Sequence, residues 1–176
     1  MSRTGHSLLL IALGVLATSP AGAHVTLGAN QATIGADYKA VFAVPHGCAG
    51  SPTIKLRVQI PEGVIAVKPL PKDGWKVDVV NGKYSAGYDY QGAKLSEGAK
   101  EVVWSGGKLR DHVRDEFVIS TYLASGLKPD TMLYFPVVQE CEQGVSRWID
   151  IPADGTAAHE HEGKSPAPGI KLMPKP

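Results

Sequence analysis

The chain has 176 residues, of which 18 are Lys or Arg and 17 are Asp or Glu, so its formal net charge at pH 7 is +1. This length is typical of one domain that builds its own hydrophobic core. Such a balanced charge provides no electrostatic basis for binding nucleic acid or an anionic membrane surface, and neither is expected as a partner.

Residues 1–23 have the features of a secretory signal peptide. Arg3 supplies a positive amino-terminal region, residues 8–16 form an apolar run, and Ala21-Gly22-Ala23 is a small-residue cleavage site. The apolar run is too short to span a bilayer, and no later stretch approaches ~20 apolar residues. We therefore predict removal of 1–23, a periplasmic or secreted product, and no stable membrane anchor after cleavage.

Cleavage after Ala23 would make His24 the first residue of the mature protein. Its free α-amine and its imidazole Nδ1 can then close a chelate ring on one metal ion, and two such nitrogen donors suit Cu(II) best among the common biological metals. Binding displaces protons from both groups, so copper affinity is expected to fall steeply below about pH 6. The alternative is that a histidine follows the cleavage site by chance.

From residue 32 to 151, short apolar runs alternate with period two and are separated by Gly, Pro, Asn and Asp. This pattern predicts strands at 38–44, 53–60, 75–79, 101–104, 116–123, 132–138 and 145–151. Turns are predicted at 61–63, 72–74, 81–82, 105–107 and 142–144. We therefore predict one all-β domain over 24–151, an antiparallel β-sandwich of immunoglobulin-like or cupredoxin-like type.

Cys48 and Cys141 are the two cysteines of a chain marked for an oxidising compartment. A disulfide between them is the favoured interpretation. It would close a loop of about 94 residues, which the chain-entropy model equates with roughly 4–5 kcal/mol of stability. A pair of thiolates that binds Cu(I) is the alternative, because soft sulfur suits that ion.

Strand parity suggests two further neighbours for a metal. If Phe117 faces the core, Glu116 faces the opposite side of the strand, and burying Ile149 and Ile151 turns Trp148 outward. The carboxylate would supply an oxygen ligand, whereas the indole N–H only donates, so the ring would shield the ion or make a cation–π contact. The alternatives are a solvated glutamate and a tryptophan that covers a sheet edge.

Residues 152–176 are rich in Pro, Ala, Gly, Glu, His and Lys and predict a flexible tail. The tail contains His159 and His161, a short His-x-His tract that either binds a second copper or is solvated and binds nothing. His46, in a predicted loop, is a further accessory donor or simply a polar loop residue. His112 lies among basic neighbours, which disfavour a cation.

Motifs spread over 24–151 carry a family resemblance. They are His24-Val25-Thr26, Val44-Pro45-His46-Gly47-Cys48, Ile60-Pro61-Glu62-Gly63-Val64, Gly74-Trp75-Lys76-Val77, Val103-Trp104-Ser105-Gly106-Gly107, Asp115-Glu116-Phe117, Leu133-Tyr134-Phe135-Pro136 and Arg147-Trp148-Ile149. Together they resemble the YcnI-like periplasmic or extracellular copper-binding family. The resemblance implies a β-sandwich that holds Cu(II) through the amine and imidazole of its amino-terminal histidine and a glutamate, with a tryptophan close by. By motif position these are His24, Glu116 and Trp148, with Asp115 and Glu140 as alternative carboxylates.

These features predict an exported copper-binding protein, not an enzyme, that acquires, buffers or delivers Cu(II), with a copper-transfer protein as candidate partner. The alternative is a copper-dependent oxidative enzyme that resembles a lytic polysaccharide monooxygenase. That site needs a second histidine, and neither His46 nor His112 has supporting context in the sequence, while aromatic residues make up only 7%. A metal-free adhesion or assembly module is a third hypothesis. The sequence contains no Walker, Gly-x-Ser-x-Gly or His-Glu-x-x-His motif, and no nucleotide cofactor is expected.

Overall fold

The computed structural model describes residues 24–152 and 165–175, and its regular elements are all β-strands. The predicted leader at 1–23 lies outside the described residues, as do His159 and His161. Within the described ranges, no helix is long and apolar enough to cross a membrane. The strands are β1 (Thr26–Leu27), β2 (Gln31–Thr33), β3 (Asp37–Val44), β4 (Thr53–Gln59), β5 (Val64–Pro69), β6 (Lys76–Tyr90), β7 (Ala93–Leu109), β8 (Asp115–Leu123), β9 (Met132–Tyr134), β10 (Val137–Cys141), β11 (Val145–Trp148) and β12 (Gly169–Met173).

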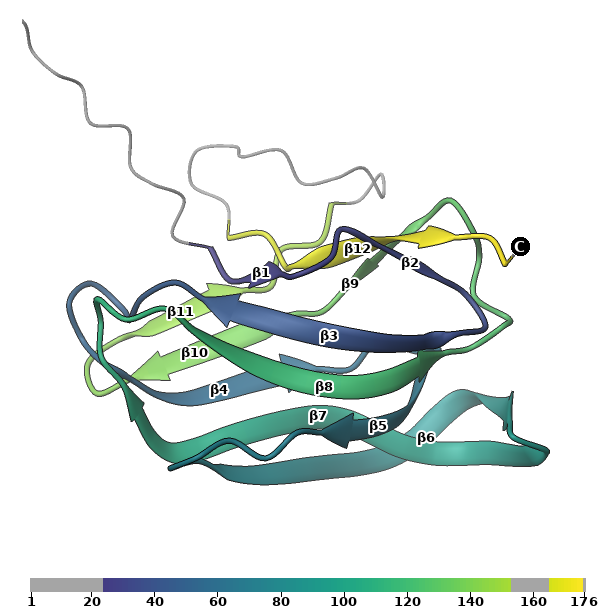
Figure 1. The fold of residues 1–176 in the computed structure, drawn as a ribbon, viewed down its shortest axis with the longest axis horizontal. Helices are drawn as coiled ribbons and strands as arrows, with labels where there is room; N and C mark the ends of the chain where they lie inside the picture. The colour runs from purple at the N-terminus through teal and green to yellow at the C-terminus, as the bar shows by residue number, and fades with distance from the viewer. Residues whose placement is uncertain (1–23, 153–164, 176) are drawn as a thin grey trace, which may run out of the picture.

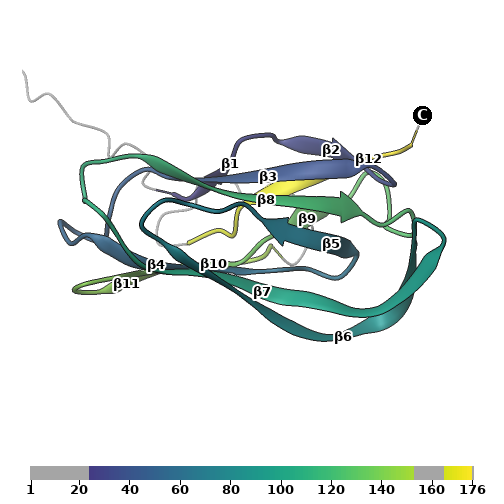
Figure 2. The ribbon, with the colours of Figure 1, turned by 60° about the horizontal axis from the view of Figure 1, so that its bottom comes forward.

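Two sheets pack face to face as a sandwich (Figures 1 and 2). One has the strand order β1-β3-β8-β5 and the other β11-β10-β4-β7-β6. A third, small sheet of order β2-β12-β9 runs along the top of Figure 1. The pairings are antiparallel except for that of β2 with β12, which is parallel. The predicted all-β sandwich is therefore confirmed, with one parallel pair added.

Large aromatic side chains fill the space between the two main sheets. Phe42 on β3, Phe117 on β8 and Trp104 on β7 are each fully buried. The rings of Trp104 and Phe117 lie 5.4 Å apart in an edge-to-face contact, which joins one sheet to the other. Full burial of one such side chain stabilises a fold by about 1.5–3 kcal/mol, so these rings hold the layers together.

Strands β6 and β7 are much longer than the sequence predicted. The predicted turns at 81–82 and 105–107 are wrong, because both segments lie inside these strands. The register shifts between Val80 and Asn81, so a β-bulge accommodates the Asn-Gly pair without ending the strand. The predicted strand at 132–138 is instead divided into β9 and β10 by Phe135-Pro136, since proline has no N–H to donate to a ladder.

The predicted flexible tail is wrong for its last part. Gly169–Met173 forms β12 between β2 and β9. Ile170 and Leu172 are buried, and the intervening Lys171 is exposed. An alternation this short cannot be recognised from the sequence of a segment rich in proline. The segment forms a strand because β2 and β9 supply its hydrogen-bond partners. The domain therefore extends beyond residue 151.

Candidate metal site at the edge of the sandwich

The edge strands of the two main sheets meet beside the first described residue. β1 is the outer strand of one sheet and β11 is the outer strand of the other. His24 precedes β1 and is half-buried, and its ring centroid lies 4.9 Å from that of Trp148 at the end of β11, with the planes tilted by 56°. Val25, next in the chain, is 2% exposed and anchors this segment in the core. The backbone nitrogen and the imidazole of His24 thus lie at the rim of the sandwich, beside an indole.

The indole of Trp148 faces the interior, so the predicted outward orientation is wrong. Trp148 pairs with the fully buried Val137 and is itself only 9% exposed. Ile149 and Ile151, which parity assigned to the core, are 43% and 54% exposed. The physical reason is that β11 ends at Trp148, and covering an indole removes more apolar surface from water than covering an isoleucine.

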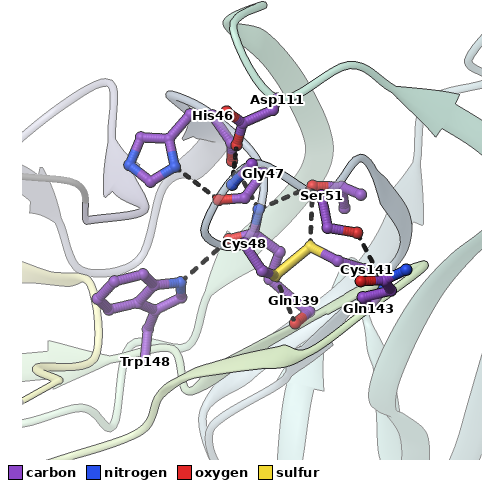
Figure 3. Close-up of a disulfide and its surroundings, with 11 residues drawn as sticks. His46, Gly47, Cys48, Ser51, Asp111, Gln139, Cys141, Gln143 and Trp148 are labelled. Atoms are coloured by element: carbon purple, nitrogen blue, oxygen red, sulfur yellow. Dashed lines mark hydrogen bonds between the residues drawn. A yellow bond between two sulfur atoms is a disulfide. The ribbon is translucent and has the colours of Figure 1, made fainter.

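A buried glutamine, Gln139 on β10, holds the indole in place (Figure 3). Its Oε1 accepts a hydrogen bond from Nε1 of Trp148 at 3.3 Å, and its Nε2 donates to the backbone oxygen of His46 and to Oγ1 of Thr53, both at 2.7 Å. The side-chain carbonyl and both N–H groups are therefore used. Sequence reasoning missed Gln139. One signal in the sequence could have identified it: Gln139 lies two residues before Cys141, so in an extended strand both side chains face the same, inward side.

The predicted disulfide between Cys48 and Cys141 is confirmed, and it ties the β3–β4 loop to β10 with the Cα atoms 5.9 Å apart. Within the loop, the N–H of Cys48 donates to the Ser51 oxygen at 2.9 Å, and the N–H of Ser51 donates back to the Cys48 oxygen at 3.0 Å. A Cβ atom on Gly47 would overlap the Ser51 oxygen, so this tight loop requires glycine there. In this oxidised form, neither sulfur is a free thiolate.

His46 is half-buried in the same loop, and its ring has a defined hydrogen bond. Nδ1 lies 2.6 Å from the backbone oxygen of Gly47. A carbonyl oxygen only accepts, so Nδ1 carries the proton and the neutral ring keeps Nε2 as its unprotonated nitrogen. In Figure 3 the ring of His46 and the indole of Trp148 lie on the same side of the disulfide.

The three carboxylates considered from the sequence differ in their partners. Asp115 forms an ion pair with Lys72 at 2.7 Å, and Glu140 forms one with Lys55 at 3.1 Å. For the carboxylate of Glu116, no hydrogen bond or ion pair is found with any residue of the described ranges. The Glu116 carboxylate is thus the one of the three that no lysine engages, although Nζ of Lys72 donates to the Glu116 backbone oxygen at 2.9 Å.

Glu116 faces the outer side of β8, as its strand parity predicts. The register places Thr26, Ala43 and Glu116 in one row across β1, β3 and β8, so about 10 Å, two strand spacings, separates the first from the last. Among the contacts of the described residues, the ring of His24 meets Trp148 and not Glu116. Within residues 24–152 and 165–175, no group of three or more His, Cys, Asp or Glu side chains lies close enough together to hold a metal ion.

Comparison with known proteins gives a family and a fold. The family model described as "Domain of unknown function (DUF1775)" matches residues 24–172, a range that includes most of β12. A crystal structure of an uncharacterized protein from Nocardia farcinica, described as revealing an immunoglobulin-like fold, is similar with a TM-score of 0.61 and 24% sequence identity, over 86% of this chain and 99% of that one. Of the two sandwich types predicted, this chain thus has the immunoglobulin-like one. No curated protein matches the chain.

Proposed function

We propose that this chain, which belongs to the family described as Domain of unknown function (DUF1775), is an exported protein that binds Cu(II). The ligands in this proposal are the α-amine and the imidazole of His24. The observation that carries this proposal is the 4.9 Å contact between the rings of His24 and Trp148. An amino-terminal histidine with a tryptophan close by is what the resemblance to the YcnI-like copper-binding family implies.

The surroundings of His24 suit a bound cation that must also be released. The residue lies at the rim and is half-buried, so an ion can reach it from solvent. The indole of Trp148 covers one side of the ring, where it excludes water and can attract a cation by about 0.5–2 kcal/mol. Its hydrogen bond to Gln139 keeps it in that position when the metal leaves. These properties fit acquisition, buffering or delivery of copper as cargo, with a copper-transfer protein as the partner.

The decisive experiment compares two forms of the mature protein. One begins at His24, and the other carries one additional alanine before it, which abolishes the free amine next to the imidazole. Titration with Cu(II) should show about a 100-fold or greater loss of affinity in the extended form and in His24→Ala, together with a changed electron paramagnetic resonance spectrum. His112→Ala is the matched control and should behave as wild type. Unchanged binding by the extended form would contradict the proposal and favour a metal-free module.

The oxygen ligand is assigned to Glu116 from the sequence resemblance, because its carboxylate is not paired with a lysine as those of Asp115 and Glu140 are, although the register sets Glu116 two strands away from β1. Glu116→Gln should weaken Cu(II) binding and alter the spectrum. Asp115→Asn and Glu140→Gln should not, because both carboxylates already pair with lysines. An effect confined to either of these two variants would move the oxygen ligand there and leave the histidine chelate intact.

The oxidative-enzyme alternative is favoured by one observation, the ring of His46 on the Trp148 side of the disulfide. Against it, binding of a polysaccharide would need a surface of aromatic side chains beside the metal. The partly exposed tyrosines of β6 lie instead on the hairpin at the other end of the sandwich (Figure 1); they are Tyr84, Tyr88 and Tyr90. Incubation with copper, a reductant and chitin or cellulose tests this alternative, and release of oxidised oligosaccharides would favour it over a binding protein.

A further inference from the structure

We propose that His46 supplies a further nitrogen ligand, through Nε2, to the copper ion held by His24. This inference rests on the proposed function and adds a second histidine to the same site. In the sequence alone, His46 is a loop histidine without context. Four features of the structure give it one: the register of β1 against β3, the contacts that lead from His24 through Trp148 and Gln139, the hydrogen bond of its ring, and the bonds that hold its loop.

The strand register brings the two histidines together. β1 and β3 pair antiparallel with Thr26 opposite Ala43. Continued by two residues, this register sets His24 opposite Pro45, the residue immediately before His46. Adjacent strands lie about 5 Å apart and successive residues are spaced about 3.3 Å along a strand, so the two histidine backbones are separated by about 6 Å. Residues directly opposite each other share a face, so alternation alone would turn the His46 side chain away from that of His24. β3 ends at Val44, however, and His46 lies in the loop beyond the ladder, where alternation no longer sets the direction of its side chain. The register therefore brings the two backbones together, and the loop contacts of His46 set the direction of its ring.

A second, independent chain of contacts leads to the same place. The ring of His24 contacts the indole of Trp148, the indole N–H donates to Gln139, and Gln139 donates to the backbone oxygen of His46. Figure 3 shows the His46 ring on the side of the loop where the indole lies. The ring of His24 and the backbone oxygen of His46 are thus both linked to Trp148, the first directly and the second through Gln139.

The His46 ring is in the tautomer that a ligand needs. Because Nδ1 donates its proton to the Gly47 oxygen at 2.6 Å, the lone pair of the neutral ring is on Nε2. Histidines that bind metals commonly donate the other ring N–H to a backbone carbonyl in this way, which fixes both the tautomer and the ring orientation. Nδ1 cannot bind the metal while it donates this hydrogen bond, so Nε2 is the nitrogen available to the ion.

The loop that carries His46 is held before any metal arrives. The disulfide from Cys48 ties it to β10, and Gln139 ties the His46 carbonyl to the same strand. The N–H of Gly47 donates to the Asp111 backbone oxygen at 3.1 Å. A ligand on such a loop is preorganised, so little conformational entropy is lost when it binds.

The test counts the imidazoles that bind copper. Mature protein loaded with one equivalent of Cu(II) is measured by pulsed electron paramagnetic resonance, in which each bound imidazole contributes a signal from its remote nitrogen. We expect two bound imidazoles in wild type and one in His46→Ala, with an affinity loss of at least about 10- to 100-fold, since the loss of a residue that merely orients a ligand already costs that much. Added free imidazole should restore the two-imidazole spectrum of the variant.

Two controls complete the design. His112→Ala should retain both imidazoles, and the double variant His159→Ala, His161→Ala shows whether the tail contributes one of them. A single imidazole in wild type, or two in His46→Ala, would overturn the inference, and the wild-type result decides even if His46→Ala fails to fold. Failure here is separate from failure of the proposed function, because loss of binding on extending the chain before His24 would still stand.

Discussion

The β3–β4 loop and the β6–β7 hairpin lie at opposite ends of the sandwich (Figure 1). Polar side chains are arranged differently at these two ends. At the end of the β3–β4 loop, Gln139 is 1% exposed, its amide oxygen and both of its N–H groups have partners, and a disulfide closes the loop. At the end of the β6–β7 hairpin, Glu62 pairs with Lys100 where the two side chains are 40% and 32% exposed. At that same end Tyr38 is buried, and its hydroxyl has no hydrogen-bond partner.

The difference shows where this fold can place atoms accurately. Hydrogen bonds in a dry, fully satisfied network are strong and leave few alternative arrangements. Ion pairs that remain in contact with water contribute about 0–1 kcal/mol and are weakened by salt. The end closed by the disulfide therefore has the rigidity that a binding site needs, and the hairpin end does not.

Breaking the disulfide should produce the largest change. Replacing Cys48 and Cys141 together by serine should lower the free energy of unfolding by roughly 4–5 kcal/mol, because the unfolded chain regains the freedom lost by closing a long loop. Urea denaturation measures this loss, and wild type under reducing conditions should show the same. A loss below about 1 kcal/mol would mean that this end is held by its hydrogen bonds alone.

Removing the glutamine should have the next largest effect. Gln139→Leu leaves the indole N–H of Trp148 and the His46 oxygen without partners, at about 1–3 kcal/mol for each buried group. The indole N–H resonance of Trp148 should move in a nuclear magnetic resonance spectrum, while those of Trp75 and Trp104 stay in place. The control is the exposed Gln143→Leu, which should alter neither stability nor the spectrum.

At the other end, removing a hydroxyl should stabilise the fold. Tyr38→Phe deletes a buried group without a partner and should raise the free energy of unfolding by about 1 kcal/mol. Burial also raises the pKa of Tyr38 to about 12. The neutral phenol is thus favoured in the folded state, and its contribution to stability is complete below pH 10 and is lost as the pH rises toward 12.

Denaturation at several pH values from 9 to 12 tests this prediction. Wild type should lose stability more steeply than Tyr38→Phe over that range. The control is Tyr90→Phe, because the hydroxyl of Tyr90, unlike that of Tyr38, has a partner: it accepts a hydrogen bond from Gln91. Parallel curves for wild type and Tyr38→Phe would show that the hydroxyl reaches water in solution.

The smallest effect is expected at the exposed ion pair. Partial desolvation by itself would raise the pKa of Glu62, but hydrogen bonds from Lys100, from Tyr88 at 2.9 Å and from the Ser85 N–H lower it more, so the net pKa is lowered. This carboxylate therefore stabilises the fold above the ordinary glutamate pKa of about 4.3, and the contribution is lost as the pH falls through the folded-state value.

Glu62→Gln should consequently change stability by less than about 1 kcal/mol at pH 7 and flatten the acid side of the stability curve. The difference from wild type should shrink in 0.5 M salt, measured by denaturation at each condition, whereas the effect of Gln139→Leu should not. A salt-independent effect of Glu62→Gln would remove the contrast between the two ends.

Strands with one buried face were predictable from local sequence. In β4, Leu56 and Val58 face the core and Arg57 faces water, and period-two alternation alone identifies such a strand. The disulfide was predictable as well, because two cysteines in a chain bound for an oxidising compartment have few other states. The position of Glu116 on the outer face of β8 follows from the same alternation.

The sequence by itself thus determined the all-β class, the pairing of Cys48 with Cys141, and His24 as the candidate copper ligand. Only the tertiary structure decided that Trp148 turns inward, that Gln139 holds it, and that β12 joins the fold. The physical reason is that alternation defines two faces of a strand, but which face is covered at a strand end depends on the partner strand and on the apolar surface left to bury. For Trp148 the partner strand is the neighbouring β10, and for β12 it is β2, at the other end of the chain.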